Sequence, residues 1–471
     1  MTNYFEVIGP PPFPPLVRGG MRGTPENRTK MCVTQPLKYL TRDLSGIGGV
    51  IKQRPSDFLV EEQPLYEPTG SGEHLLLYVE KRSQTTSDVI RRVAKMFHVR
   101  RRDVGYAGLK DKHAITRQHL SVYLPNPTND EKYLSRFEFT PFKLLWSHRH
   151  ANKLRRGHLK SNRFVIYIRD VEPTAAVRAK AVVDRLTTSG MANYVGSQRF
   201  GYRQNNHILG KLLMLEQWQP FLDELLGGPE ESDGEATHLG RQAYEKGDYE
   251  AALSVWPKRL RHDRQALDAR RQGLSPREAA MLVDNQQREY LISALQSALF
   301  NEVLDNRIRD ELVHRIVPGD LAWKHGNRSV FLVDEATAEK ENAADGRVNR
   351  REISPSGPMW GQGMIKPSGR VLEWETQCLT QNGLSESDFA RNEHAVGGRR
   401  PLRVDVIDPD VSGGSDEHGP YVRIALELSR GSFATSMLRE IMKDDCVSMG
   451  RAAPGVSRSS VAQNINQKDS L

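Results

Sequence analysis

Two blocks of strand-like sequence enclose a long helical stretch, and this order restricts the possible folds more than any other feature. Short apolar or alternating segments up to residue 171 predict strands, and such segments resume at 400–408 and 421–428. Between them, segments such as 288–308 have a sequence pattern typical of helices, and no internal repeat is visible. The chain is therefore predicted to be an α+β domain into which a second, mainly helical domain is inserted.

The change in texture gives the expected domain boundaries. We assign residues 45–205 and 398–445 to the α+β domain and residues 206–397 to the inserted domain. Residues 1–44 are rich in Pro, Gly and Thr and show no periodicity, and residues 446–471 are polar. Segments of this kind bury too little apolar surface to order themselves, so we expect both to be disordered.

Composition excludes several classes of protein. Hydrophobic residues make up 38% of the chain and charged residues 27%, which is typical of a soluble globular protein. No apolar run approaches the roughly 20 residues of a membrane helix, and the N-terminus lacks the pattern of a signal peptide. The 3 cysteines have no metal-ligand spacing. We expect a cytoplasmic protein with free thiols, no metal and no membrane partner.

The net charge of +8 suggests an anionic partner, and its distribution is more informative than its sum. His148–Arg163 holds 6 Lys or Arg, 3 His and no acid, which fits either a solvated loop or contact with phosphates. Asp223–Glu235 is acidic and is expected to face away from a nucleic acid. Ser432 is expected to cap the last helix, whose exposed N-terminus could hold a phosphate.

The segment Gly105–Gln118, GYAGLKDKHAITRQ, carries the strongest chemical signal. Its small residues allow close approach of a backbone or a ligand. They lead into a loop where one carboxylate, Asp111, stands among many hydrogen-bond donors. The loop could be a basic surface turn, or Asp111 could be a nucleophile that a nearby cation keeps ionised.

This loop resembles the signature AGxKD followed by AxTxQ of the TruD family of tRNA pseudouridine synthases. Further segments resemble the family's motifs in the family's order, and the resemblance extends from about Gly46 to Lys443. They are IKQRPSDFLVEE, GSGEH, KLRRGHLKSNRF, NYVGSQRFG, SALFN, GPMWG and LSRGSFATSMLRE.

The resemblance implies a pseudouridine-synthase catalytic core with an inserted TruD-type domain, forming a cleft that binds RNA. It also implies isomerisation of a uridine to pseudouridine, typically uridine 13 of tRNA, without a metal or organic cofactor. We expect tRNA to be the partner and the enzyme to be a monomer.

The resemblance also implies roles for individual residues. Asp111 matches the family's catalytic aspartate, and Asn193 matches an active-site asparagine. The residues expected to bind the substrate are Lys52, Phe58, Asn193, Tyr194, Lys110 and Gln118.

One position departs from the family pattern. The family's NYFG motif usually carries an aromatic residue where Val195 stands. An aromatic ring contributes roughly 1–3 kcal/mol by stacking on a base, and valine offers apolar contact without such a face. Tyr194 or Phe58 would have to compensate, and we expect Val195→Phe to keep or raise activity.

The carboxylate of Asp111 needs a cationic partner. Successive side chains on an extended segment point to opposite faces, so Lys110 is a poor candidate and Lys52 a better one. Three chemical paths remain open: attack on the anomeric carbon, attack on the uracil ring, or removal of a sugar proton.

Two other functions fit parts of the sequence. A non-catalytic RNA-binding protein on a degenerate synthase fold would bind RNA equally well after Asp111→Asn. A hydrolase of nucleotides or nucleic acids would normally need several acids for metal ions, and the loop has one. Neither a GxxxxGK[ST] phosphate loop nor a GxSxG elbow is present.

Overall fold

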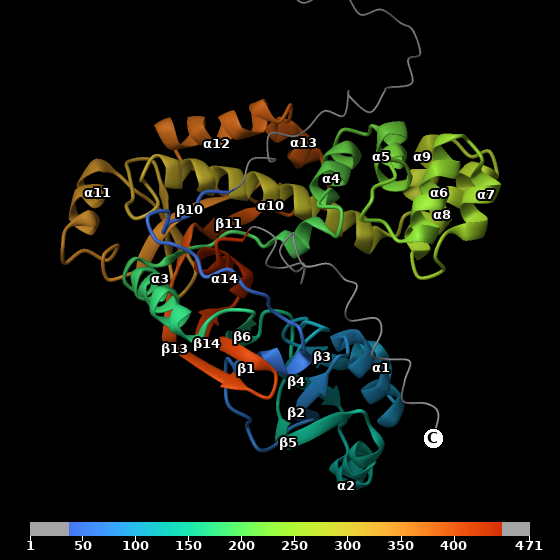
Figure 1. Cartoon of the computed structure of the whole chain (residues 1–471), viewed down its shortest axis with the longest axis horizontal. Coiled ribbons are helices and arrows are strands. Elements are labelled where there is room, and N and C mark those ends of the chain that lie inside the picture. Colours follow the sequence, from blue (N-terminus) through green and yellow to red (C-terminus); the bar gives the residue numbers. More distant parts are fainter. Residues whose placement is uncertain (1–36, 445–471) are drawn as a thin grey trace, which may run out of the picture.

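The computed structural model describes residues 37–444, and a mixed sheet of eight strands dominates the lower half of the view in Figure 1. Its order is β13-β14-β6-β1-β4-β2-β5, with β3 paired to β4. The strands are β1 (Phe58–Pro64), β2 (His74–Arg82), β3 (Val104–Tyr106), β4 (Ile115–Tyr123), β5 (Phe142–His150), β6 (Leu159–Arg169), β13 (Val406–Asp416) and β14 (Gly419–Ser429).

The two C-terminal strands complete a sheet that the N-terminal part of the chain begins. β14 pairs antiparallel with β6 along most of its length, from Tyr421 opposite Arg169 to Ser429 opposite Ser161. These partners lie 252 to 268 positions apart in the sequence, so the intervening segment is inserted into one sheet domain, as the sequence predicted. β5 was not predicted, because its residues are mostly polar or half-buried.

Helices cover the sheet and close its core. α3 (Ala176–Ser189) and α14 (Ala434–Met442) share one hydrophobic cluster with the strands β6 and β14. α1 (Thr86–Met96) packs in a second cluster with β2 and β4, and α2 is a short helix at Asp130–Leu134. α14 begins one residue later than expected, because its N-cap is Phe433 and not Ser432. The two-stranded pair of β7 (Met191–Ala192) and β12 (Arg403–Val404) lies where the inserted segment leaves and rejoins this domain.

The inserted segment is built around the helix α10 (Asn285–Arg309), which runs across the upper half of Figure 1. Most of the residues in the second half of α10 are buried, which explains why it lacks a clear polar face. The other helices are α4 (Asn206–Met214), α5 (Trp218–Leu226), α6 (Glu235–Glu245), α7 (Tyr249–Val255), α8 (Arg261–Arg271), α9 (Pro276–Met281), α11 (Glu335–Asn342), α12 (Gly369–Gln381) and α13 (Glu386–Arg391).

A four-stranded sheet, ordered β11-β10-β8-β9, accompanies these helices. The sequence predicted the helical character of the segment but not this sheet. Strands of three to seven residues give too short a pattern to separate from loops. The strands are β8 (Leu321–Lys324), β9 (Val330–Leu332), β10 (Ile353–Met359) and β11 (Gly398–Pro401).

The expected disorder up to residue 44 is wrong for residues 37–44, which pack on the folded chain. The Lys38 backbone N–H donates to Asp305 at 2.6 Å, and the Thr41 hydroxyl donates to Glu440 at 2.6 Å. Thr41 is fully buried. The predictions of disorder for residues 1–36 and 446–471 concern parts of the chain outside the described residues.

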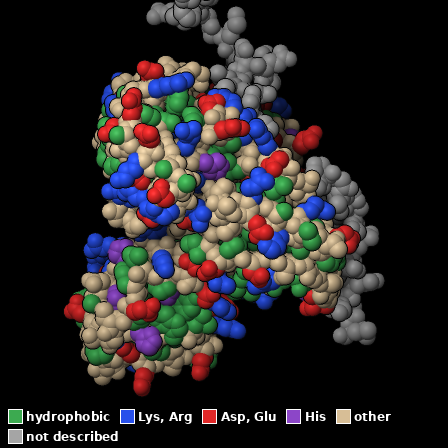
Figure 2. Space-filling model, turned by 90° about the vertical axis from the view of Figure 1, so that its left-hand side faces the viewer, with side chains coloured by type: hydrophobic (Ala, Val, Ile, Leu, Met, Phe, Trp, Pro, Cys, Tyr) green, Lys and Arg blue, Asp and Glu red, His purple; other side chains and the backbone are tan. Residues whose placement is uncertain are grey.

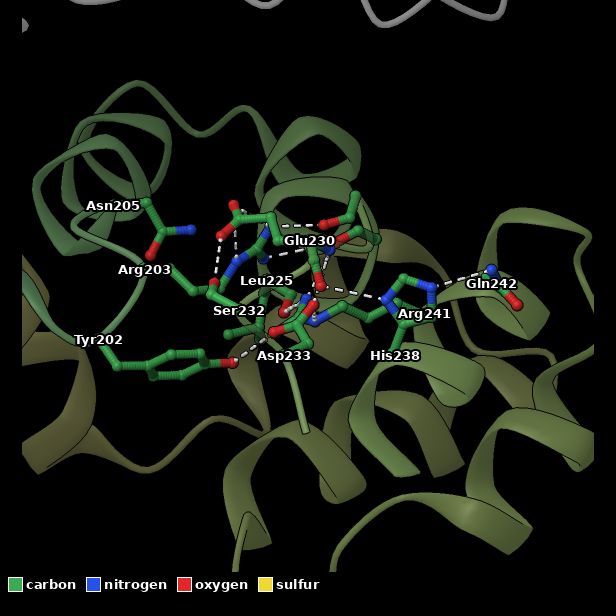
Figure 3. Close-up of polar contacts among 12 residues, drawn as sticks. Tyr202, Arg203, Asn205, Leu225, Glu230, Ser232, Asp233, His238, Arg241 and Gln242 are labelled. Atoms are coloured by element: carbon green, nitrogen blue, oxygen red, sulfur yellow. Dashed lines mark hydrogen bonds and ion pairs between the residues drawn. The ribbon is translucent and has the colours of Figure 1, made fainter. Parts of the chain in front are cut away.

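Arg203, just before α4, and Arg241, on α6, bind part of the acidic stretch Asp223–Glu235 (Figure 3). Asp233 and Arg241 form an ion pair at 3.3 Å, and both side chains are buried. Arg203 donates to Glu230 at 3.0 Å. These carboxylates therefore hold the loop between α5 and α6 to the helices around it.

No helix in the described part of the chain is long and apolar enough to cross a membrane. The described residues also contain no group of three or more His, Cys, Asp or Glu side chains arranged to hold a metal ion. Cys378 is a free, buried thiol, and burial raises its pKa to about 12. Cys32 and Cys446 lie outside the described residues.

Candidate active site

The strands β1 and β4 bring Lys52 and Asp111 together. They are neighbours in the sheet and run parallel, with Leu59 opposite Ile115. Parallel neighbours start at the same edge of a sheet, so the segment that leads into β1 meets the loop that leads into β4. The first carries Lys52 and the second carries Asp111.

The two side chains form an ion pair with 2.8 Å between the Lys52 Nζ and the Asp111 Oδ2. The Lys52 side chain is 9% exposed and that of Asp111 is 32% exposed. The expected partner of Asp111 is thus confirmed, and the carboxylate is the more accessible member of the pair. The backbone of Lys52 also has a φ of 58°. Residues other than glycine rarely adopt such a positive φ, and those that do are found more often at functional sites.

The ring of Phe58 contacts the ammonium group of this ion pair. The Lys52 Nζ lies 4.3 Å from the centroid of the Phe58 ring, a cation–π distance. Phe58 is 2% exposed and meets Phe164 edge to face at 6.2 Å. The ring therefore restricts the position of the Lys52 ammonium group. Because the ring is buried in this conformation, a base has almost no free surface of Phe58 to stack on.

Lys81, which the sequence did not single out, anchors the loop that carries Asp111. Its buried ammonium group donates to the backbone oxygen of Asp111 at 2.8 Å and to that of Gln84 at 2.7 Å. Burial lowers the pKa of Lys81 to about 8, although the charge of Asp111 opposes this shift. The available signal was the alternation of the strand, which places Lys81 on the same face as Leu77 and Val79.

Lys110 and Gln118 lie inside the protein, which does not support direct contact with a substrate. The Lys110 ammonium is 2.6 Å from Glu62, and the two side chains are 5% and 1% exposed. The Thr86 hydroxyl accepts a bond from the Lys110 backbone and donates to Gln118, both at 3.0 Å. These residues hold the loop in place.

Removing the Lys110 charge should destabilise the protein. Burial raises the pKa of Glu62, but the hydrogen bond with His119 and the charge of Lys110 leave that pKa below its ordinary value. Lys110→Met would leave a buried carboxylate with one partner fewer. Breaking such a pair costs about 3–5 kcal/mol, and we expect a loss of this order in urea unfolding at pH 7.

The size of this loss should depend on pH. A carboxyl group with a lowered folded-state pKa stabilises the fold above its unfolded value, and that contribution is lost as pH falls through the folded value. The difference between wild type and Lys110→Met should therefore shrink as pH falls below the ordinary Glu62 value of 4.5. An equal difference at pH 7 and pH 4 would contradict the ion pair as its source.

Asn193 and Tyr194 face the inserted segment. The Asn193 amide donates to the Pro401 backbone oxygen at 2.8 Å and accepts from Arg400 at 2.7 Å. The Tyr194 hydroxyl donates to Asp305 at 2.8 Å, and burial raises the pKa of Tyr194 well above its ordinary value. Both residues are at most 4% exposed. They join the two parts of the chain and, in this conformation, leave little surface for a base.

Val195 is buried in the same junction. It is 4% exposed and packs in a cluster with Phe300 and Leu402. Its backbone N–H donates to Asn301 at 2.8 Å, and its carbonyl oxygen accepts from the same amide at 2.9 Å. The SALFN motif of α10 thus holds the NYVG segment through the Asn301 amide.

This burial changes the expectation for Val195→Phe. A larger side chain in a packed cluster forces its neighbours to shift, which costs about 1–3 kcal/mol. We now expect the variant to lose that much free energy of unfolding, measured by urea denaturation. A variant as stable as wild type would show that the cluster has room for the ring.

Basic side chains gather at the junction of the two parts of the molecule. In Figure 2 the surface is notched at the left between an upper and a lower lobe, and Lys and Arg side chains lie on both margins of the notch. Positive charge along a concave surface favours a polyanion such as a nucleic-acid strand.

The chain matches one known protein family over most of its length. The model of the family described as tRNA pseudouridine synthase D (TruD) matches residues 36–441. The chain is 40% identical over 409 residues to tRNA pseudouridine synthase D of Geobacter sulfurreducens, covering 86% of this chain and 97% of that protein. It is 35% identical over 425 residues to the Thermus thermophilus protein of the same name, covering 90% and 97%.

A solved structure shows the same architecture. The crystal structure of a protein from Methanosarcina mazei, provisionally named tRNA pseudouridine synthase D, matches with a TM-score of 0.69 at 25% identity. The match covers 86% of this chain and 96% of that one. The predicted α+β synthase core with an insertion is therefore confirmed as the fold.

Proposed function

The chain belongs to the TruD family and is a tRNA pseudouridine synthase, and from this membership we propose that it isomerises uridine 13 of tRNA with Asp111 as the nucleophile. The proposed role of Asp111 is supported by its ion pair with Lys52 at 2.8 Å, in which the carboxylate is the more exposed partner. A nucleophile needs both properties: a cation that keeps it ionised and a surface that a substrate can reach.

The reaction rearranges the uridine without adding or removing atoms. The bond between N1 of uracil and the anomeric carbon breaks, the base turns over, and a bond forms from C5 to the same carbon. The proton released from C5 is balanced by one taken up at nitrogen. We propose that no cofactor takes part, since neither an oxidant nor a reductant is required.

The residues around Asp111 suit this reaction in different ways. The target base must leave its stack to reach the carboxylate, at a cost of a few kcal/mol. Lys52 forms an ion pair with the Asp111 carboxylate, and the Phe58 ring lies against the Lys52 ammonium group. Lys81 and Lys110 fix the loop through buried contacts. Asn193 and Tyr194 act at the junction with the inserted segment, so we propose supporting roles for them.

The position of the target can be tested directly. A transcript of unmodified tRNA with uridine at position 13 should gain one pseudouridine there, and a transcript with cytidine at that position should gain none. Pseudouridine at another position in both transcripts would refute the choice of uridine 13 and leave the synthase activity standing. We further propose that the enzyme acts as a monomer in the cytoplasm, where it meets its tRNA.

A further inference from the structure

Three arginines meet at the turn between β14 and α14. Arg400 donates to the backbone oxygen of Gly431 at 2.9 Å, and Arg328 donates to that of Arg430 at 3.5 Å. Arg430 in turn donates to the backbone oxygen of Gly157. We call Arg328, Arg400 and Arg430 the arginine cluster.

The arginine cluster joins distant segments of the chain. Arg328 lies in the hairpin between β8 and β9 of the inserted segment, and Arg400 lies on β11. Arg430 follows β14 of the sheet domain. Gly157, in the basic connector between β5 and β6, also donates its N–H to Ala107 at 2.7 Å. Ala107 belongs to the loop that carries Asp111, so the cluster is two hydrogen bonds from that loop.

These three guanidinium groups have no anionic partner in the structure. Across residues 37–444, every hydrogen bond that they donate ends on a backbone oxygen or on the Asn193 amide, and no carboxylate lies within ion-pair distance. The neighbouring Arg399 shows the contrast, because both of its terminal nitrogens reach Glu375 at 2.7 Å. The Nε of Arg400 is buried and has no hydrogen-bond partner among the described residues.

Such an arrangement is unfavourable without an anion. Burial lowers the pKa of Arg400 to about 9, and the charge of Arg199 adds to this shift. Partial burial and the charge of Arg430 likewise lower the pKa of Arg328. Guanidinium groups present several hydrogen-bond donors in one plane, and this geometry matches the oxygens of a phosphate. A bound phosphate would therefore offset the repulsion among these positive charges.

We propose that the arginine cluster binds a phosphodiester group of the RNA strand beside the target nucleotide. This inference rests on tRNA being the substrate. Since the cluster draws on both parts of the molecule, the bound phosphate would also hold the inserted segment against the sheet domain while the uridine is at Asp111.

Arg328→Gln is the most informative variant, because Arg328 is exposed and its side chain makes a single hydrogen bond within residues 37–444, the long bond to Arg430. Affinity for unmodified tRNA would be measured over a series of salt concentrations. Losing one phosphate contact reduces the slope of log affinity against log salt by about 0.7–0.9. We expect this reduction, a higher KM and an unchanged kcat. Arg178→Gln removes the same charge from an exposed position on α3 and should leave the slope at its wild-type value.

Each outcome bears on the proposal. A slope for Arg328→Gln equal to that of wild type and Arg178→Gln would overturn it, provided the three proteins melt at the same temperature. Arg430→Gln provides a second test from the sheet domain and should reduce the slope similarly. The wild-type protein could bind tRNA with a steeper slope of log affinity against log salt than Arg328→Gln and yet form no pseudouridine. In that case the proposed reaction fails while the phosphate site stands.

Discussion

Replacing Lys52 by methionine should lower the rate of pseudouridine formation by about 10²–10³-fold, the usual effect of removing one electrostatic contact in an active site. Methionine keeps an unbranched stem over Phe58 and removes the ammonium that lies 2.8 Å from Asp111. The rate would be measured under single-turnover conditions by release of tritium from C5 of uridine in the tRNA. Affinity for tRNA should change little, because the ammonium is only 9% exposed.

Lys52→Arg is the matched control. It retains the positive charge, although a guanidinium is larger and planar, and it should recover part of the lost rate. Both variants must keep the melting temperature of wild type for the comparison to hold. A Lys52→Met enzyme with the wild-type rate would mean that Asp111 needs no cation from this position.

The sequence predicted the fold and the central ion pair for physical reasons. The hydrophobic periodicity changes from that of strands to that of helices and back again along the chain. The insertion could therefore be predicted without a structure. The alternation of side chains in an extended segment made Lys110 a poor candidate for the partner of Asp111, and the structure pairs Lys110 with Glu62 instead.

Other features depend on contacts between segments far apart in the chain. The order of strands places β1 beside β4, and no local pattern specifies that neighbour. The backbone contacts of Lys81, the burial of Val195 and the docking of Thr41 on Glu440 are tertiary in the same sense. Residues 37–44 lack periodicity, yet Glu440 and Asp305 supply the hydrogen bonds that their backbone needs.

Asp111→Asn should have the largest effect of any single substitution. The amide has nearly the same shape as the carboxylate but is a poor nucleophile, so the rate should fall by at least about 10⁴-fold. The loop should keep its position, because Lys81 binds the backbone oxygen of residue 111 and not its side chain. Circular dichroism and tRNA affinity should therefore match wild type.

The most direct test of the whole account compares wild type and Asp111→Asn on the same unmodified tRNA, with pseudouridine mapped at single-nucleotide resolution. We predict one modified position, uridine 13, with the wild-type protein and none with the variant, at equal tRNA binding. Pseudouridine formed at a comparable rate by Asp111→Asn would contradict the assignment of Asp111 as the nucleophile.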